Sequence, residues 1–178
     1  MSRLCRSRLG MSGWHVTENH RLAQAETKMP PPGIMTSLRI REQSMEAFNL
    51  SKEQQWDPKK HVEKILGEVE NGDYTVACWE PGQISPNHCH PHATEIYFCF
   101  SGGGKMRTPK ETIDVVPGAF VVHPPGEVHE YINGPQRTIL FRIRYGSDML
   151  SRHIEWRGHP DFKQSADDAE YYRNNPPR

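Results

Sequence analysis

The chain has 178 residues, a length that suits one domain with or without tails. Its 22 basic residues balance its 22 acidic residues, which excludes an overall electrostatic attraction to nucleic acid or to an anionic membrane. Apolar residues make up 35% of the chain, which indicates a smaller core with polar extensions.

Targeting signals do not stand out in the sequence. No apolar run approaches the roughly 20 residues of a membrane-spanning helix, and the arginine-bearing N-terminus lacks the apolar core of a secretory signal. Its first 28 residues faintly resemble a transit peptide, but we favour a plain extension. Without an export signal we expect a cytoplasmic protein with reduced thiols. The cysteines, none in a CxxC pair, are Cys5, Cys78, Cys89 and Cys99.

The first part of the chain is expected to be a flexible extension, residues 1–44, because it has no sustained apolar period and is broken by Pro30 to Gly33. A short strand is possible within it near residues 36–40. We expect an edge strand at residues 44–50, where the chain enters the domain, and polar surface at residues 51–60.

Residues 61–79 fit two patterns. Val62, Ile65 and Leu66 follow helical spacing. The Asn71-Gly72 dipeptide, however, is a strong hairpin signal, and residues 74–79 are rich in strand formers. We favour a hairpin of about residues 62–69 and 74–80.

The rest of the domain, bounded at residues 45–147, reads as short strands. Glycine and proline turns arrive every 8 to 12 residues, with apolar runs at residues 96–100, 119–122 and 137–145 between them. This pattern predicts an all-β sandwich or barrel. The C-terminal extension, residues 148–178, should hold a short strand or helical turn at 149–156 and a polar helical turn at 165–172.

Two histidine-bearing stretches carry the chemistry. Residues 82–102 contain His88, His90 and Glu95, and two histidines two apart point to the same face of a strand. Imidazole and carboxylate are natural ligands for borderline divalent metals. His129, from a later strand, would complete a set of three nitrogens and one oxygen, which leaves open positions on a six-coordinate ion.

The spacing of both stretches makes the chain resemble the cupin superfamily. The first motif fits without a gap at Gly82, His88, His90, Glu95 and Gly102. The second fits without a gap at Gly118, Pro124, Gly126, His129 and Asn133, and 15 residues separate the two. The resemblance covers about residues 46–146.

What the resemblance implies is a single-domain jelly-roll β-barrel of all-β class with polar N- and C-terminal extensions. It also implies one divalent metal ion (Fe, Mn, Zn or Ni) on His88, His90, Glu95 and His129. A homodimer paired through edge strands is expected, with residues 45–50 as the candidate edge. The glycines Gly82, Gly102, Gly118 and Gly126 should lie in turns with a positive φ or a close backbone approach.

Other polar residues have weaker assignments. His92 should lie on the rim, and the side chain of Cys89 should point away from those of its histidine neighbours. His123 is a candidate proton shuttle, or else a structural histidine. Tyr97, Cys99 and Tyr131 lie an even number of residues from a metal ligand on the same strand, so their side chains should point to the same face. They are therefore candidates to line the cavity, although core packing is the commoner role of such residues.

Arg142 and Arg144 alternate with apolar residues on the last strand of the domain. If either points inward, it would anchor a carboxylate or phosphate of the substrate. The alternative, which we favour from sequence, places both on the solvent face.

The superfamily resemblance does not choose a reaction. The full ligand set with an aromatic and apolar lining favours an Fe(II)- or Mn(II)-dependent dioxygenase or lyase acting on a small oxygenated substrate. A sugar or keto-acid isomerase, epimerase or decarboxylase would need a proton shuttle such as His123, Tyr97, Tyr131 or Glu127. A non-catalytic small-molecule-binding cupin is the third alternative.

Overall fold

The computed structural model of the chain describes residues 45–178. The expected flexible extension of residues 1–44 and the short strand near 36–40 therefore lie outside the described residues. No helix in the described part of the chain is long and apolar enough to cross a membrane.

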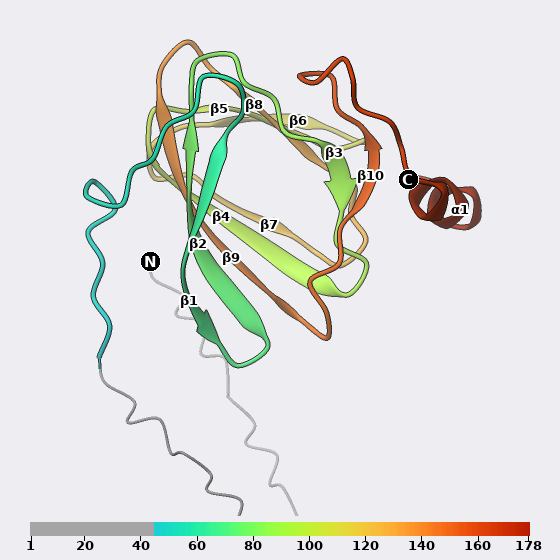
Figure 1. Cartoon of the computed structure of the whole chain (residues 1–178), viewed down its shortest axis with the longest axis horizontal. Coiled ribbons are helices and arrows are strands. Elements are labelled where there is room, and N and C mark those ends of the chain that lie inside the picture. Colours follow the sequence, from blue (N-terminus) through green and yellow to red (C-terminus); the bar gives the residue numbers. More distant parts are fainter. Residues whose placement is uncertain (1–44) are drawn as a thin grey trace, which may run out of the picture. The chain divides into compact units, whose positions relative to one another are not determined.

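Ten antiparallel strands and one helix make up the described part (Figure 1). The strands form a five-stranded sheet of order β1-β2-β9-β4-β7, a three-stranded sheet β6-β5-β8 and a two-stranded sheet β10-β3. Together they close a jelly-roll barrel, which confirms the predicted all-β class. The elements are β1 (Val62–Val69), β2 (Gly72–Trp79), β3 (Asn87–Cys89), β4 (Ala93–Ser101), β5 (Gly104–Arg107), β6 (Thr112–Val115), β7 (Phe120–His123), β8 (Glu130–Asn133), β9 (Thr138–Gly146), β10 (Arg152–Glu155) and α1 (Ala166–Asn174).

The hairpin predicted from the Asn-Gly signal is confirmed. β1 and β2 pair in antiparallel register, and Glu70 and Asn71 form the two-residue connection between them. Glu70 has a positive φ of 48°, as a tight hairpin turn of this kind requires.

The edge strand predicted at residues 44–50 is wrong. Residues 45–50, the described part of this segment, form no strand; instead Leu50, with Trp56, packs against Val76 and Ile139 on the outer face of the five-stranded sheet. The apolar side chains of this segment cover the sheet face, so the segment does not extend the sheet through backbone hydrogen bonds. The edge that was expected to pair two copies is therefore not formed by these residues.

The inner face of the five-stranded sheet changes character along its strands. Ala77, Leu140 and Cys99 form an apolar row across β2, β9 and β4, and they belong to the main core cluster. The next rows toward the other end of the sheet carry Arg142 and then Glu95 on the same inward face. An apolar core thus fills one end of the barrel, and polar side chains line the other.

The C-terminal segment lies against the barrel rather than apart from it. β10 pairs with β3, and α1 contacts β10. The predicted strand within 149–156 and the helical turn at 165–172 are both confirmed. The helix begins after Ser165, whose side chain accepts a hydrogen bond from the Asp168 amide, as a helix N-cap does.

The four motif glycines all have positive φ, as predicted: 74° at Gly82, 77° at Gly102, 89° at Gly118 and 80° at Gly126. They differ in the space around them. A Cβ on Gly102 would lie 2.3 Å from the backbone oxygen of Arg137, whereas nothing lies within 4 Å of a Cβ on Gly118.

This difference predicts unequal costs of substitution. Gly118→Ala should lower the free energy of unfolding by about 1–2 kcal/mol, the cost of a left-handed backbone for a residue with a side chain. Gly102→Ala should lower the free energy of unfolding by clearly more than this, because the backbone near Arg137 must also move to make room for the Cβ. Urea unfolding of both variants measures the difference, and equal costs would contradict it.

Candidate metal centre

Four buried side chains from three neighbouring segments converge at the polar end of the barrel. His88 lies on β3, His90 follows that strand, and their ligand atoms lie with that of Glu95 from β4 within 4.8 Å of one another. His129 faces His88 through an isolated bridge, and its Nε2 lies 2.8 Å from Oε2 of Glu95. The structure thus brings all four predicted ligands together.

Backbone carbonyls fix how the three histidine rings are turned. The Nδ1 atoms lie within hydrogen-bond distance of the carbonyl oxygens of Pro86 (2.9 Å, from His88), Leu150 (3.1 Å, from His90) and Glu127 (3.0 Å, from His129). Because a carbonyl only accepts, each Nδ1 carries the proton and each Nε2 presents a lone pair to the centre. Metal-binding histidines are commonly oriented in this way.

The donor atoms at the centre fit a divalent cation. Nε2 of His90 and Oε1 of Glu95 are buried and have no hydrogen-bond partner among the described residues, a costly state for polar atoms. Nε2 of His129 lies 2.8 Å from Oε2 of Glu95, and either a shared proton or a cation between the residues would satisfy both atoms. Imidazole and carboxylate are suitable ligands for Fe, Mn, Zn or Ni.

The electrostatics agree with this donor set. Burial and the neighbouring His129 hold the pKa of His88 well below its usual value, so the imidazole is neutral. Burial opposes ionisation of Glu95, but its contacts with His129 and His90 outweigh burial and keep its pKa well below the usual range. The centre therefore offers a neutral imidazole at His88 and a carboxylate at Glu95.

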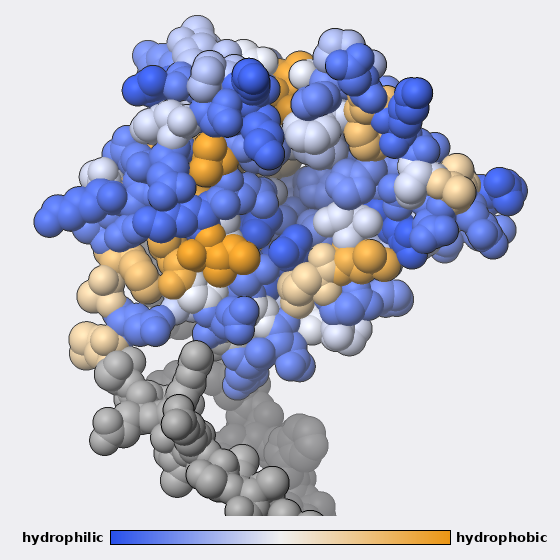
Figure 2. Space-filling view, viewed as in Figure 1, coloured by the Kyte–Doolittle hydropathy of each residue, from blue (hydrophilic) through white to orange (hydrophobic). Residues whose placement is uncertain are grey.

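A cavity of about 430 Å³ leads from solvent to the centre. It opens between the β1-β2 hairpin and the β3-β10 pair, and Figure 2 shows it as a recess bordered mostly by hydrophilic residues. Aromatic side chains wall it: His61 stacks on Trp79 at 4.0 Å between ring centroids, and Trp156 lies across from them.

Two of the three predicted catalytic residues lie beside the ligands. Tyr97 lines the cavity, and burial, with the charge of Glu95, raises the pKa of its hydroxyl well above the usual value. His123 is stacked on His129 with 3.8 Å between ring centroids, and its Nδ1 lies 2.8 Å from Oε2 of Glu127. Tyr97 can thus donate a hydrogen bond to a bound molecule, whereas His123 holds the ring of a ligand in place.

The remaining candidates lie away from the centre. Tyr131 is in the apolar core, where its hydroxyl donates to Asn133. Cys99 belongs to the same core, and His92 is exposed. The side chain of Cys89 points away from the two histidines, as predicted, and α1 covers it, with the Tyr172 hydroxyl 3.3 Å from its sulfur.

The interpretation that placed Arg142 and Arg144 on the solvent face is wrong. Arg142 is 3% exposed and points into the barrel, where it pairs with Glu63 at 3.0 Å and Asp73 at 3.2 Å. Arg144 lines the cavity and pairs with Asp73 at 2.9 Å. The carboxylates of Glu63 on β1 and of the buried Asp73 on β2 make the inner face suitable for arginine.

Residues outside both motifs also build the site. Ser151, His153 and Trp156, from the C-terminal segment, line the cavity, and the carbonyl of Leu150 holds the ring of His90. Pairing of β10 with β3 depends on contacts across more than 60 residues, so local pattern alone did not reveal it. Asp73 and Glu63 occupy alternating positions of the predicted hairpin whose side chains face the barrel interior. That alternation is the sequence signal that could have identified them.

Glu63 should make stability depend on pH in acid. Burial opposes its ionisation, but His61 and the charge of Arg142 outweigh burial and lower its pKa to about 2. A carboxyl whose pKa falls on folding contributes stability that is present above its unfolded pKa of about 4.3 and lost as the pH falls toward the folded value. Glu63→Gln should therefore show a shallower loss of stability below about pH 4.3 than the wild type in urea unfolding. Glu68→Gln, at an exposed position of the same strand, should behave like the wild type.

The comparisons with known proteins agree with this architecture. The family described as Cupin domain matches residues 75–140, which include the four ligands. This barrel is a cupin domain. The comparison with curated proteins gave no match.

Solved structures share the cupin fold at low sequence identity. An uncharacterized conserved protein with a double-stranded β-helix domain from Klebsiella pneumoniae is 19% identical, with a TM-score of 0.58 over 63% of this chain and 99% of that one. An RmlC-like cupin protein from Desulfovibrio desulfuricans is 20% identical, with a TM-score of 0.53 over 57% and 97%. The DMSP lyase DddQ from Ruegeria pomeroyi is 22% identical, with a TM-score of 0.50 over 56% and 54%.

Proposed function

We propose that this cupin is a metal-dependent enzyme of the dioxygenase or lyase kind that acts on a small oxygenated organic substrate. One observation carries the proposal: three oriented imidazoles and a carboxylate converge at the inner end of a cavity that is open to solvent. A site with a closed ligand shell and no cavity would be structural.

His88, His90, Glu95 and His129 would hold one divalent ion. Such an ion supplies Lewis acidity and, with iron, the capacity to activate O₂. The chain itself supplies the surroundings. Trp79, Trp156 and Tyr97 line the cavity where a substrate would lie.

Tyr97 is the catalytic residue that this geometry favours. Because its raised pKa keeps it protonated, it can donate a proton or a hydrogen bond to a substrate oxygen. Tyr97→Phe should lower kcat about 10²–10⁴-fold, the usual contribution of a positioned acid or base. The metal content of the Tyr97→Phe variant should equal that of the wild type. If the variant and the wild type had the same kcat, Tyr97 would have no catalytic role.

The reaction class can be tested on protein loaded separately with Fe(II) and Mn(II). Oxygen uptake and product formation are followed on a panel of enols, diketones, catechols and hydroxy acids, with DMSP added because a lyase for it shares the fold. Metal-dependent uptake of O₂ identifies a dioxygenase, and product without uptake identifies a lyase. Full metal loading with no turnover on any panel member would contradict the proposal and favour a binding protein.

A further inference from the structure

The two arginines inside the barrel share one of the carboxylates that pair with them. Asp73 serves both: its Oδ1 lies 3.2 Å from Nη2 of Arg142, and its Oδ2 lies 2.9 Å from Nη2 of Arg144. Glu63 pairs with Arg142, while Glu95 belongs to the metal centre. One carboxylate is thus shared between two guanidinium groups.

Arg142 is held mainly by groups inside the barrel, although its buried Nε has no hydrogen-bond partner among residues 45–178. Besides Glu63 and Asp73, it donates to the Thr75 hydroxyl at 3.1 Å and lies 3.6 Å from Oε1 of Glu95. Its side chain is almost completely buried. Its role is therefore to hold the carboxylates of neighbouring strands in place.

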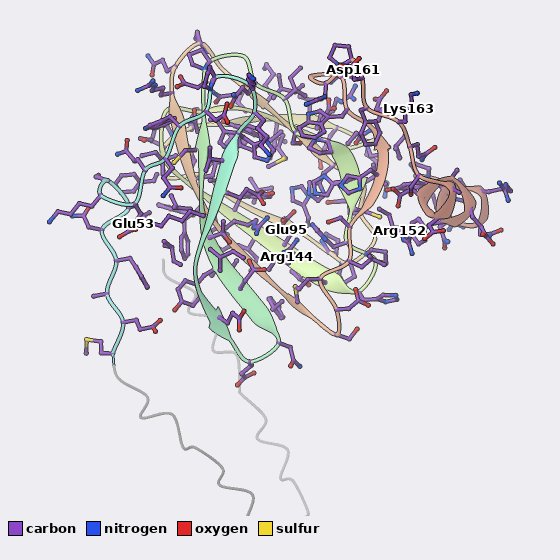
Figure 3. All side chains as sticks on the ribbon, viewed as in Figure 1. Glu53, Glu95, Arg144, Arg152, Asp161 and Lys163 are labelled. Carbon is purple, nitrogen blue, oxygen red and sulfur yellow. The ribbon has the colours of Figure 1, made fainter. Side chains whose placement is uncertain are left out.

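Arg144 is different. Asp73 is its one ion-pair partner among residues 45–178, whereas Arg142 lies within ion-pair distance of three carboxylates. The buried Nε of Arg144, like that of Arg142, has no hydrogen-bond partner there. It lines the cavity, and it is the cross-strand partner of Glu95, beside which it lies in Figure 3. Lys60, also on the cavity wall, makes no ion pair within the described residues. Cationic donors therefore remain next to the metal centre.

The charge balance indicates what they would bind. Arg142, Arg144 and a bound divalent ion would carry four positive charges, and Glu63, Asp73 and Glu95 three negative ones, since histidines bind a metal ion as neutral imidazoles. Lys60 is exposed and solvated at the entrance, so it is not counted. One positive charge is left over next to the centre, and a ligand with one negative charge would cancel it. A carboxylate carries one, whereas a phosphate monoester carries about 1.5 to 2 at neutral pH.

We propose that the cavity takes a small organic monocarboxylate whose carboxylate is bound by Arg144, with Lys60 at the entrance. The organic part would lie against the tryptophan wall, next to Tyr97 and the metal ligands. Arginine is suited to this task because its planar fork matches a carboxylate. The assignment rests on the proposed function for the identity of the reacting end, but carboxylate binding itself can be measured without turnover.

The test uses the metal-loaded full chain and propanoate as the probe, with binding followed by the fluorescence of the cavity residues Trp79 and Trp156. Propanoate should bind saturably, and its neutral amide, propanamide, should bind at least tenfold more weakly. Arg144→Gln should weaken propanoate binding tenfold or more, as expected for loss of a charge-assisted contact. Arg173→Gln, at an exposed position on α1, should bind like the wild type.

Further arms separate the possible failures. Arg144→Lys keeps the positive charge but loses the planar fork, so its affinity for propanoate should lie between those of the wild type and Arg144→Gln. It also provides the test if the glutamine variant fails to fold. Equal binding of propanoate and propanamide, or unchanged binding in both Arg144 variants, would overturn the proposal, as would tighter binding of inorganic phosphate. Propanoate binding together with no turnover of any member of the substrate panel would support the anion site while contradicting the proposed enzyme.

Discussion

Replacing His129 with alanine is expected to lower the affinity for the metal ion by more than about 100-fold. That is the upper end of the loss seen when an outer-shell partner of a metal ligand is removed, and His129 would itself be a ligand. Its Nε2 lies 2.8 Å from Oε2 of Glu95, so the variant also leaves that carboxylate without its neighbour. Isothermal titration of the metal-free protein with Zn²⁺ or Mn²⁺ measures the change.

The matched control is His92→Ala. His92 belongs to the same histidine-rich stretch, but it is exposed and lies outside the cluster of ligand atoms. It should bind metal like the wild type. Equal affinities in the two variants would show that the second motif does not complete the centre. Circular dichroism on both proteins separates loss of a ligand from loss of the fold.

Replacing Arg142 with methionine should lower the free energy of unfolding by about 3–5 kcal/mol, the cost of removing one partner from a buried ion pair. The methionine retains much of the packing volume but leaves Glu63 and Asp73 without the guanidinium between them. Glu95 also loses a positive charge 3.6 Å away. Urea unfolding of the metal-free protein measures the effect apart from metal binding.

Arg137→Gln provides the comparison for Arg142. Arg137 is an exposed arginine that pairs with Glu80 at 2.7 Å, and solvent weakens such pairs. Its loss should be much smaller than that of Arg142→Met. A similar small loss in both variants would mean that Arg142 is not a structural part of the barrel interior.

The metal ligands and the barrel could be predicted because their signals are local. A strand of alternating pattern places Glu95 on the inner face, and motif spacing places His88, His90 and His129 relative to the turns. The same turns require positive φ, which explains the glycines at fixed positions.

The other parts of the site depend on contacts between distant segments. The direction of Arg142 is decided by Glu63 and Asp73, 79 and 69 residues away along the chain. The ring of His90 depends on the carbonyl of Leu150, 60 residues away, and any side chain at position 150 provides that carbonyl. Within residues 45–50, Leu50 packs on the sheet, where it covers apolar side chains of β2 and β9. None of these contacts between distant segments leaves a pattern in the local sequence from which it could be predicted.

The central claim is that the four ligands hold a divalent ion. Elemental analysis of the full-length protein, purified without a chelator and then loaded in turn with Fe(II), Mn²⁺, Zn²⁺ and Ni²⁺, tests it most directly. About one ion per chain should be retained after gel filtration with at least one of these metals, as expected for one set of three imidazoles and one carboxylate. Retention below about a tenth of an ion per chain with all four metals would contradict the account.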